Sequence, residues 1–188
     1  PLNESMATTI DSAVRLGRCF VGFIIFTDLD GTLLEHRTYG WSEAEPALHR
    51  IRREDWPLIP VTSKTRAEVV ALYDALQLSG PIVVENGGGI FLPDVPPWSA
   101  LGDLADGGHF VGRDLHRPGP AAAPSALPRR VVLGEPWATL RQFVAEHGDE
   151  LGMRGFGDLS CAEVMELTGL DRVAAARAQQ REFTEPFV

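Results

Sequence analysis

Residues 24–34 read Ile-Ile-Phe-Thr-Asp-Leu-Asp-Gly-Thr-Leu-Leu, an apolar run that ends in two aspartates one residue apart. Residues 20–27 are continuously apolar with β-branched and aromatic side chains, which is typical of a strand covered on both faces. Side chains two positions apart in an extended chain point to the same side, so Asp28 and Asp30 should lie together at the carboxyl end of this strand. Gly31 allows a sharp turn that leaves both carboxylates uncovered.

Helical and apolar patterns alternate after this strand. Capping boxes begin three helices: Ser42 with Glu45, Thr65 with Glu68 and, later in the chain, Ser160 with Glu163. The expected order is helix, strand, helix, strand, over residues 42–53, 57–62, 65–78 and 82–85. This alternation predicts an α/β protein with a Rossmann-like parallel sheet and crossover helices.

Three parts are expected along the chain of 188 residues: an N-terminal extension at 1–18, a core at 19–90 and a second unit at 91–188. The second unit includes a Pro/Gly-rich loop at residues 93–128, because seven of the 14 prolines lie there. Regular structure resumes after the loop, with a strand and then helices expected at residues 130–133, 136–147, 160–167 and from 171.

Composition excludes several classes of partner and location. The formal net charge of -9 argues against nucleic acid and acidic membranes as partners, since both need a basic face. The apolar run near the N-terminus is too short to span a bilayer. The two cysteines, Cys19 and Cys161, lie far apart without a repeated framework and are expected to stay reduced. We therefore expect a cytoplasmic protein.

Two neighbouring carboxylates repel each other unless a cation or a proton lies between them. A divalent metal ion would let one carboxylate act as a nucleophile while the other serves as general acid and base. The alternative is structural, because an Asp-Gly turn can simply close a strand.

Lys64 is the only lysine among 17 basic residues. It follows the second expected strand, beside the hydroxyls of Thr62 and Ser63 and at the start of a helix. Free backbone N–H groups and the helix dipole favour a bound phosphate at such a position. The alternative is a solvated helix start that carries an ordinary surface lysine.

The segment Asp28-Leu29-Asp30-Gly31-Thr32, with Thr62, resembles the first two motifs of the haloacid dehalogenase superfamily of phosphotransferases. Within that superfamily the chain is similar to the family of mannosyl-3-phosphoglycerate phosphatases, over residues 63–68, 84–89, 167–170 and 181–183. The resemblance covers about residues 23–188, with 93–128 poorly matched. It implies a haloacid dehalogenase core with an inserted α+β cap domain, the second unit.

The resemblance also implies residue roles. Asp28 would attack phosphorus and Asp30 would act as general acid and base, with Mg²⁺ held by the Asp28 carboxylate and the Asp30 backbone carbonyl. Thr62 would hold the transferring phosphoryl group. The other residues expected to bind phosphate or substrate are Ser63, Lys64, Arg66, Asn86, Asp158, Ser160 and Arg181. For the last three a structural role is the alternative: Asp158 and Ser160 would only cap a helix, and Arg181 would be a surface residue.

The implied reaction is hydrolysis of mannosyl- or glucosyl-3-phosphoglycerate, a small phosphorylated sugar acid, through an aspartyl-phosphate. No return of the cap, phosphate-binding lysine or final acidic metal ligand is visible before Val188. We therefore expect a fragment or a natural truncation that is much less active than a full-length relative and self-associates through its incomplete core. Two alternatives stay open: another capped sugar phosphatase or phosphomutase of the superfamily, and a non-catalytic module that binds phosphorylated sugar acids.

Overall fold

The computed structural model describes residues 23–35, 38–95, 97–100 and 127–188. The N-terminal extension expected at 1–18, Cys19 and most of the Pro/Gly-rich loop lie outside the described residues. The strands are β1 (Ile25–Thr27), β2 (Leu58–Pro60), β3 (Ile82–Val84), β4 (Gly89–Leu92) and β5 (Arg129–Val132). The helices are α2 (Glu45–Arg53), α3 (Arg66–Tyr73), α5 (Trp137–Leu151), α6 (Cys161–Thr168) and α7 (Arg172–Ala178), with short 3₁₀ turns η1 (Glu85–Gly87), η2 (Trp98–Ala100) and η3 (Phe156–Asp158).

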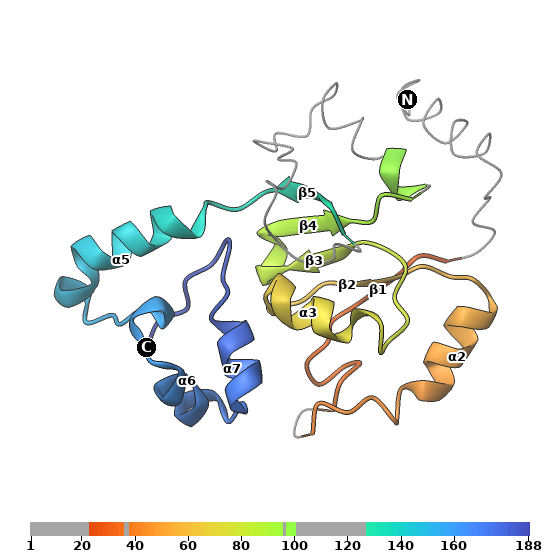
Figure 1. The fold of residues 1–188 in the computed structure, drawn as a ribbon, viewed down its shortest axis with the longest axis horizontal. Coiled ribbons are helices and arrows are strands. Elements are labelled where there is room, and N and C mark those ends of the chain that lie inside the picture. The colour runs from red at the N-terminus through yellow and green to blue at the C-terminus, as the bar shows by residue number, and fades with distance from the viewer. Residues whose placement is uncertain (1–22, 36–37, 96, 101–126) are drawn as a thin grey trace.

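The strands follow one another across the molecule (Figure 1). β1 and β2 run parallel, and a parallel bridge between Val61 and Val83 ties the end of β2 to β3. β4 then runs antiparallel to β3, and β5 antiparallel to β4. The α/β class with a parallel sheet is thus confirmed. β4 crosses the boundary expected between residues 90 and 91, and β5 lies beyond it.

Two of the three expected capping boxes mark the start of a helix, and one does not. Thr65 caps α3 and Ser160 caps α6, each in a full capping box as expected. The capping box at Ser42 was wrong: α2 begins at Glu45, and its N-cap Ala44 makes no side-chain hydrogen bond. Residues 41–44 form a turn instead, in which the Ala44 amide donates to Trp41 O at 3.0 Å. A proline in the first turn of α2 suits this later start, because an N-terminal proline loses no helical hydrogen bond.

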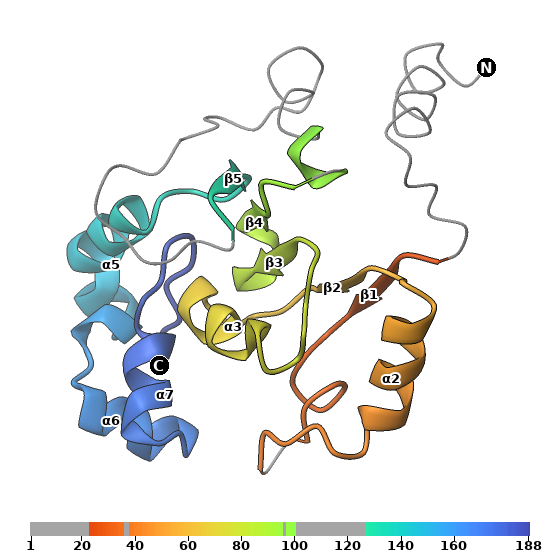
Figure 2. The same ribbon diagram turned by 45° about the vertical axis from the view of Figure 1, so that its right-hand side comes forward.

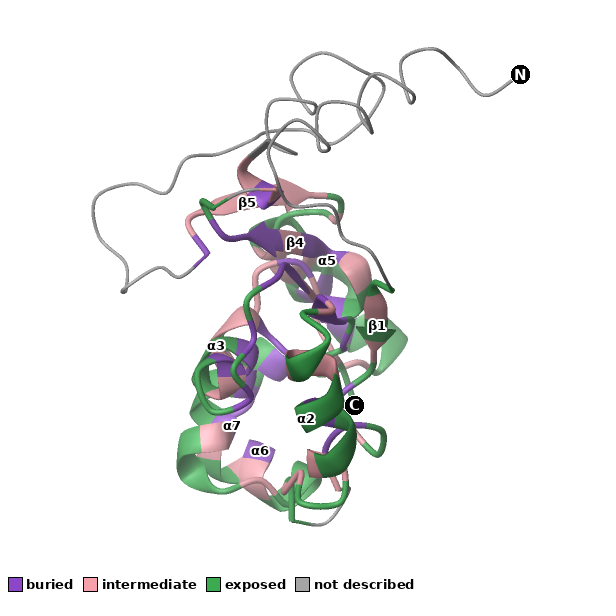
Figure 3. Cartoon of the chain, turned by 90° about the vertical axis from the view of Figure 1, so that its right-hand side faces the viewer, coloured by how far each residue is buried: buried purple, intermediate pink, exposed green. Residues whose placement is uncertain are grey.

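The main hydrophobic core lies between the sheet and helices α2 and α3, and Figure 3 shows buried residues concentrated at β4. Leu29, Leu48, Val69 and Ile82 are each no more than 1% exposed. Its fully or nearly buried members also include Leu34, Leu76, Val84, Phe91, Leu127 and Phe183. The last of these comes from the C-terminal segment, so the end of the described chain is part of the same core.

Gly89 permits that contact. A Cβ atom at this position would lie 2.3 Å from Cε2 of Phe183, a distance that real contacts do not reach. The Phe183 ring lies 6.3 Å from the Phe91 ring, centroid to centroid. The glycine-rich run after β3 therefore leaves room for an aromatic side chain on the sheet.

A smaller core joins α6, α7 and η3 through Phe156, Leu159, Val164, Ala175 and Ala178. Figures 1 and 2 both show α7 beside α3, and the Thr65 hydroxyl donates to Arg177 O at 2.9 Å across this contact. Cys161, at the start of α6, is a free thiol. Among the described residues, no helix is both long enough and apolar enough to cross a membrane.

Candidate active site

The parallel pairing of β1 and β2 brings their carboxyl ends together. Thr27 ends β1 and Pro60 ends β2, and the Val61 amide donates to Thr27 O at 2.8 Å. Asp28 follows the first strand end directly, and Thr62 lies two residues beyond the second. The predicted convergence of the two motifs at one sheet edge is therefore present in the fold.

The turn after Asp28 separates apolar from acidic side chains. Gly31 has a left-handed φ of 70°, and Leu29 O accepts hydrogen bonds from the amides of Leu33 and Leu34 at 3.1 and 2.8 Å. Leu29 and Leu34 are fully buried, whereas Asp28 is exposed and Asp30 is half-buried. The Asp-Gly turn thus exists, and it also presents both carboxylates at the sheet edge.

Asp28 and Asp30 differ in their partners. The Asp28 carboxylate makes no ion pair or side-chain hydrogen bond with another residue of the described chain. Asp30 Oδ1 lies 2.9 Å from Lys64 Nζ. Oδ1 is buried and has no other partner among the described residues, so the Lys64 charge is what compensates its desolvation.

Lys64 is a buried cation. Its side chain is only 10% exposed, and Nζ also lies 3.7 Å from Glu68 Oε1 and 4.8 Å from the centroid of the Tyr39 ring. The alternative of an ordinary solvated lysine is wrong, because ammonium groups are buried only where carboxylates or other partners compensate their desolvation. Glu68, which sequence reasoning treated as a capping residue only, is a second carboxylate beside this ammonium.

Thr62 is buried and belongs to a hydrogen-bonded loop. Its amide donates to Val83 O at 3.0 Å, and its Oγ1 accepts from the Lys64 amide at 3.2 Å. Ser63 is exposed. Asn86 is exposed too, in a left-handed conformation with φ 58°, and its amide donates to Thr62 O at 3.0 Å. The structure thus brings Ser63 and Asn86 to the same loop cluster as Thr62.

Arg66 contacts the C-terminal segment that contains Arg181, and Arg181 in turn contacts the loop just before Arg66. Arg66 Nε donates to Glu182 Oε1 at 2.8 Å, and its guanidinium lies 4.8 Å from the centroid of the Phe91 ring. Arg181 Nη1 donates to Ser63 O at 2.9 Å and Nε to Ala178 O at 3.0 Å. Arg181 is therefore more than a surface residue, since it connects the second unit to the loop that carries Thr62 and Lys64.

Asp158 and Ser160 have structural partners within the second unit. Arg141 forms an ion pair with Asp158, and this hydrogen-bonded guanidinium lowers the pKa of Asp158. Ser160 Oγ accepts from the Glu163 amide at 3.3 Å, and the Ser160 backbone amide in turn lowers the pKa of Glu163 to about 2. These contacts give Asp158 and Ser160 a structural role within the second unit. Substrate binding by either residue stays a prediction.

Glu85 is the residue of this region that sequence reasoning missed. Its side chain is buried, and both carboxylate oxygens accept hydrogen bonds from the segment 182–184. A glutamate directly after an apolar strand and before three glycines is a weak sequence signal. Its partners are about a hundred positions away, beyond the reach of any local pattern.

The donor set at the sheet edge fits a magnesium ion. The described residues contain no cluster of three or more His, Cys, Asp or Glu side chains suited to a metal. Mg²⁺, however, binds through one or two carboxylates and keeps waters or phosphate oxygens as its other ligands. The unpaired, exposed carboxylate of Asp28 beside Asp30 offers hard oxygen ligands of this kind.

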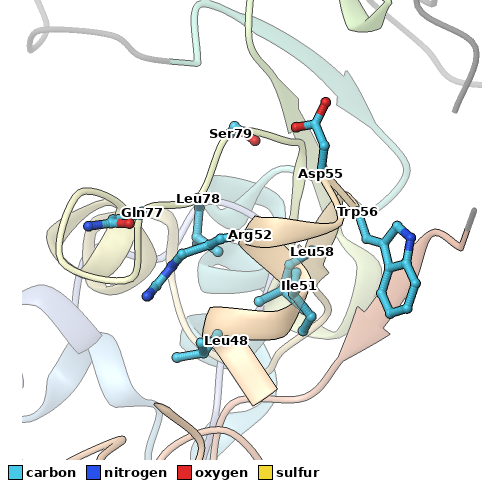
Figure 4. Close-up of a pocket in the computed structure, with 9 residues that line it drawn as sticks. All are labelled: Leu48, Ile51, Arg52, Asp55, Trp56, Leu58, Gln77, Leu78 and Ser79. Atoms are coloured by element: carbon cyan, nitrogen blue, oxygen red, sulfur yellow. The ribbon is translucent and has the colours of Figure 1, made fainter. Parts of the chain in front are cut away.

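A pocket lies elsewhere, between α2 and the turn before β3 (Figure 4). Its volume is about 180 Å³, and its lining consists of Leu48, Ile51, Arg52, Asp55, Trp56, Leu58, Gln77, Leu78 and Ser79. These residues lie near the amino ends of β2 and β3, opposite the aspartates. The volume is below the several hundred Å³ typical of ligand sites, so this hollow is not the expected site.

Comparisons with known proteins agree with the sequence motifs. Residues 25–97 match the family model of haloacid dehalogenase-like hydrolases. Two curated relatives are named glucosyl-3-phosphoglycerate/mannosyl-3-phosphoglycerate phosphatase. The relative from Persephonella marina is 33% identical over 165 residues, which is 88% of this chain and 54% of the relative. The relative from Methanococcoides burtonii is 36% identical over 166 residues, which is 87% of this chain and 54% of the relative.

The chain therefore spans about half the length of the curated relatives it matches. A solved haloacid dehalogenase-like hydrolase from Bacteroides thetaiotaomicron is 27% identical, over 41% of this chain and 28% of that one, with a TM-score of 0.33. That overlap is too partial to add to the assignment.

Proposed function

We propose that this chain is a haloacid dehalogenase-like hydrolase that acts as a Mg²⁺-dependent phosphatase of glucosyl- or mannosyl-3-phosphoglycerate, because residues 25–97 match that family model and two curated relatives are similar over most of the chain. The reaction yields the glycosylglycerate and inorganic phosphate. One observation carries the proposal: Asp28, Asp30, Thr62 and Lys64 share the carboxyl edge of β1 and β2. The names of the two curated relatives support the choice of substrate.

Asp28 is the nucleophile. Its exposed carboxylate is not held by another described side chain. An Asp28 oxygen forms a bond to phosphorus while the bond from phosphorus to the sugar-acid oxygen breaks, and the departing oxygen takes a proton from Asp30. Water then attacks the phosphorus of the aspartyl-phosphate and gives a proton to Asp30. The bond from phosphorus to the Asp28 oxygen breaks, so phosphate is released and the Asp28 carboxylate is restored.

Thr62 and Lys64 hold the transferring group. Since Thr62 Oγ1 accepts from the Lys64 amide, its own O–H proton is available to a phosphoryl oxygen. The Lys64 ammonium supplies a positive charge beside the negative oxygens. In phosphoryl transfer such positioning and charge neutralisation provide most of the acceleration. Mg²⁺, when bound by the Asp28 carboxylate and the Asp30 carbonyl, adds further neutralisation of the phosphoryl oxygens.

The second unit supplies the contacts for the sugar-acid part of the substrate. Arg181 lies within reach of the loop at residues 62–64 and is our candidate for pairing with the glycerate carboxylate. Contacts from Arg66, Asp158 and Ser160 to the substrate stay predictions, as do the cytoplasmic location and self-association. The expected partner is a small phosphorylated sugar acid, and nucleic acid and membranes are not expected to bind.

Phosphate release from a panel of substrates tests the proposal. Glucosyl- and mannosyl-3-phosphoglycerate should be hydrolysed with Mg²⁺ and not with a chelator, and simple hexose phosphates should be poor substrates. The Asp28→Asn variant should release no phosphate. A preference for hexose phosphates would indicate a different sugar phosphatase, and tight calorimetric binding without any phosphate release would indicate a binding module. Either result would overturn the proposal.

A further inference from the structure

The side chain of Glu85 holds the C-terminal segment against the core. It is 1% exposed. Its carboxylate accepts from the amides of Glu182, Phe183 and Thr184 at 2.8, 3.0 and 2.8 Å, and from the Thr184 hydroxyl at 2.7 Å. An ionised carboxylate accepts hydrogen bonds and donates none, so it matches a set of partners made entirely of donors.

The backbone of the same region holds the loop that carries Thr62 and Lys64. The Glu85 amide donates to Lys64 O at 3.0 Å, and the Asn86 amide donates to Thr62 O at 3.0 Å. Glu85 and Asn86 have left-handed φ angles of 51° and 58°. Residues other than glycine adopt this conformation rarely, and it persists only where the surroundings determine it.

Arg181 completes the connection from the other side. Its Nη1 donates to Ser63 O at 2.9 Å, and also to the hydroxyl of Thr184 at 3.3 Å. Consequently the three successive carbonyls of residues 62–64 accept from Asn86, Arg181 and Glu85 respectively. Two of these donors belong to η1, and the third adjoins the segment that the Glu85 carboxylate holds.

We propose that Glu85 is a positioning residue that couples the docking of residues 181–184 to the geometry of the loop at residues 62–64. Its carboxylate fixes the 182–184 backbone, which places Arg181 on Ser63 O, while its own amide fixes Lys64 O. The effect on turnover rests on the proposed phosphatase function, whereas the effect on the loop does not. The proposal therefore assigns a role at the site to a residue that touches neither substrate nor metal.

Hydrogen exchange of the folded chain, with Glu85→Gln as the main variant, tests the coupling. Glutamine keeps the size of the side chain but turns an NH₂ donor toward at least one backbone donor. Amides in residues 181–185 should exchange at least about tenfold faster, and so should those in residues 62–66. Glu185→Gln is the matched control, because Glu185 is also buried in this segment but pairs with Arg141 within the second unit. It should leave residues 62–66 unchanged.

Arg181→Ala removes the contact to Ser63 O but leaves the Glu85 carboxylate in place, so it tests the contact between Arg181 and the loop separately. It is also the test to use if Glu85→Gln fails to fold. It should speed exchange in residues 62–66 about as much as Glu85→Gln does. Exchange in residues 62–66 within twofold of the wild type in the folded variants would overturn the proposal, even if residues 181–185 loosen, because Glu85 would then be a tether only.

Kinetics give an independent readout. In an active enzyme, Glu85→Gln should lower kcat about tenfold with KM changed less than threefold, because the loop positions the reacting group. In the exchange experiment, the Glu85→Gln/Arg181→Ala double variant should exchange residues 62–66 no faster than the faster single variant, since both act through one loop. Additive increases in that exchange would overturn the coupling. Absence of phosphate release by this chain and by any longer protein that contains it would refute the phosphatase function and leave the exchange experiment to decide the coupling.

Discussion

Replacing Lys64 with methionine should slow phosphate release about 10- to 150-fold. Methionine keeps an unbranched stem that can pack against the Tyr39 ring, so the change removes mainly the charge beside Asp30. A contact to a charged group contributes about 1.5–3 kcal/mol, and about 1.4 kcal/mol corresponds to a tenfold change. Lys64 is 10% exposed but Asp30 is 32% exposed, so solvent screening favours the lower part of this range.

The assay is the initial rate of phosphate release against substrate concentration with saturating Mg²⁺, on this chain and on any longer protein that contains it. Arg53→Met is the matched control. Arg53 is 73% exposed and pairs with Glu54 at 2.8 Å on the surface, so its loss should leave the kinetics unchanged. Rates within twofold of the wild type for Lys64→Met would show that the buried ammonium serves stability alone, and would refute its role in phosphate binding.

Three further predictions concern the site and the fold. Asp28→Asn should abolish turnover without lowering the melting temperature by more than a few degrees, because an amide keeps the shape but is a poor nucleophile; near-normal phosphate release would remove Asp28 from the mechanism. Gly89→Ala should destabilise the chain by about 1–3 kcal/mol, since its Cβ would meet Phe183 at 2.3 Å; an unchanged melting temperature would show that the ring moves freely. The pKa of Glu163 falls from 4.5 to about 2, so its stabilising contribution is present above pH 4.5 and is lost as the pH falls toward 2. The difference in melting temperature between wild type and Glu163→Gln should shrink over that interval, and a constant difference would contradict it.

Local sequence signals predicted the part of the site that local structure builds. An apolar run before Asp28, and another before Thr62, were enough to place both motifs at strand ends, because parallel neighbours share a carboxyl edge. The box of Thr65 and Glu68 marked the start of α3 correctly. The isolation of Lys64 in the sequence indicated a special position, and the structure places it beside Asp30.

Local sequence patterns could not predict contacts between segments that are far apart in the chain. β4 was missed because Gly89 opens it and glycine is depleted in strands, although the missing side chain is what admits Phe183. The expected helix 65–78 was too long: α3 ends at Tyr73, and the chain turns at Gln77, whose φ is 53°. The leucines that follow Tyr73 continue an apolar pattern that a helix would also show, so periodicity alone cannot locate this end.

The site and the second unit share one structural element, the N-terminus of α3. Thr65 caps the helix, and its hydroxyl donates to Arg177 O of α7 at 2.9 Å. One residue earlier Lys64 pairs with Asp30, and one residue later Arg66 pairs with Glu182. A shift of the second unit must therefore either break these contacts or move the helix start that carries Lys64. Thr65 is fully buried, and its hydroxyl is costly to leave without a partner. We therefore expect the helix start to follow a shift of the second unit, and to move Lys64, the cation beside Asp30.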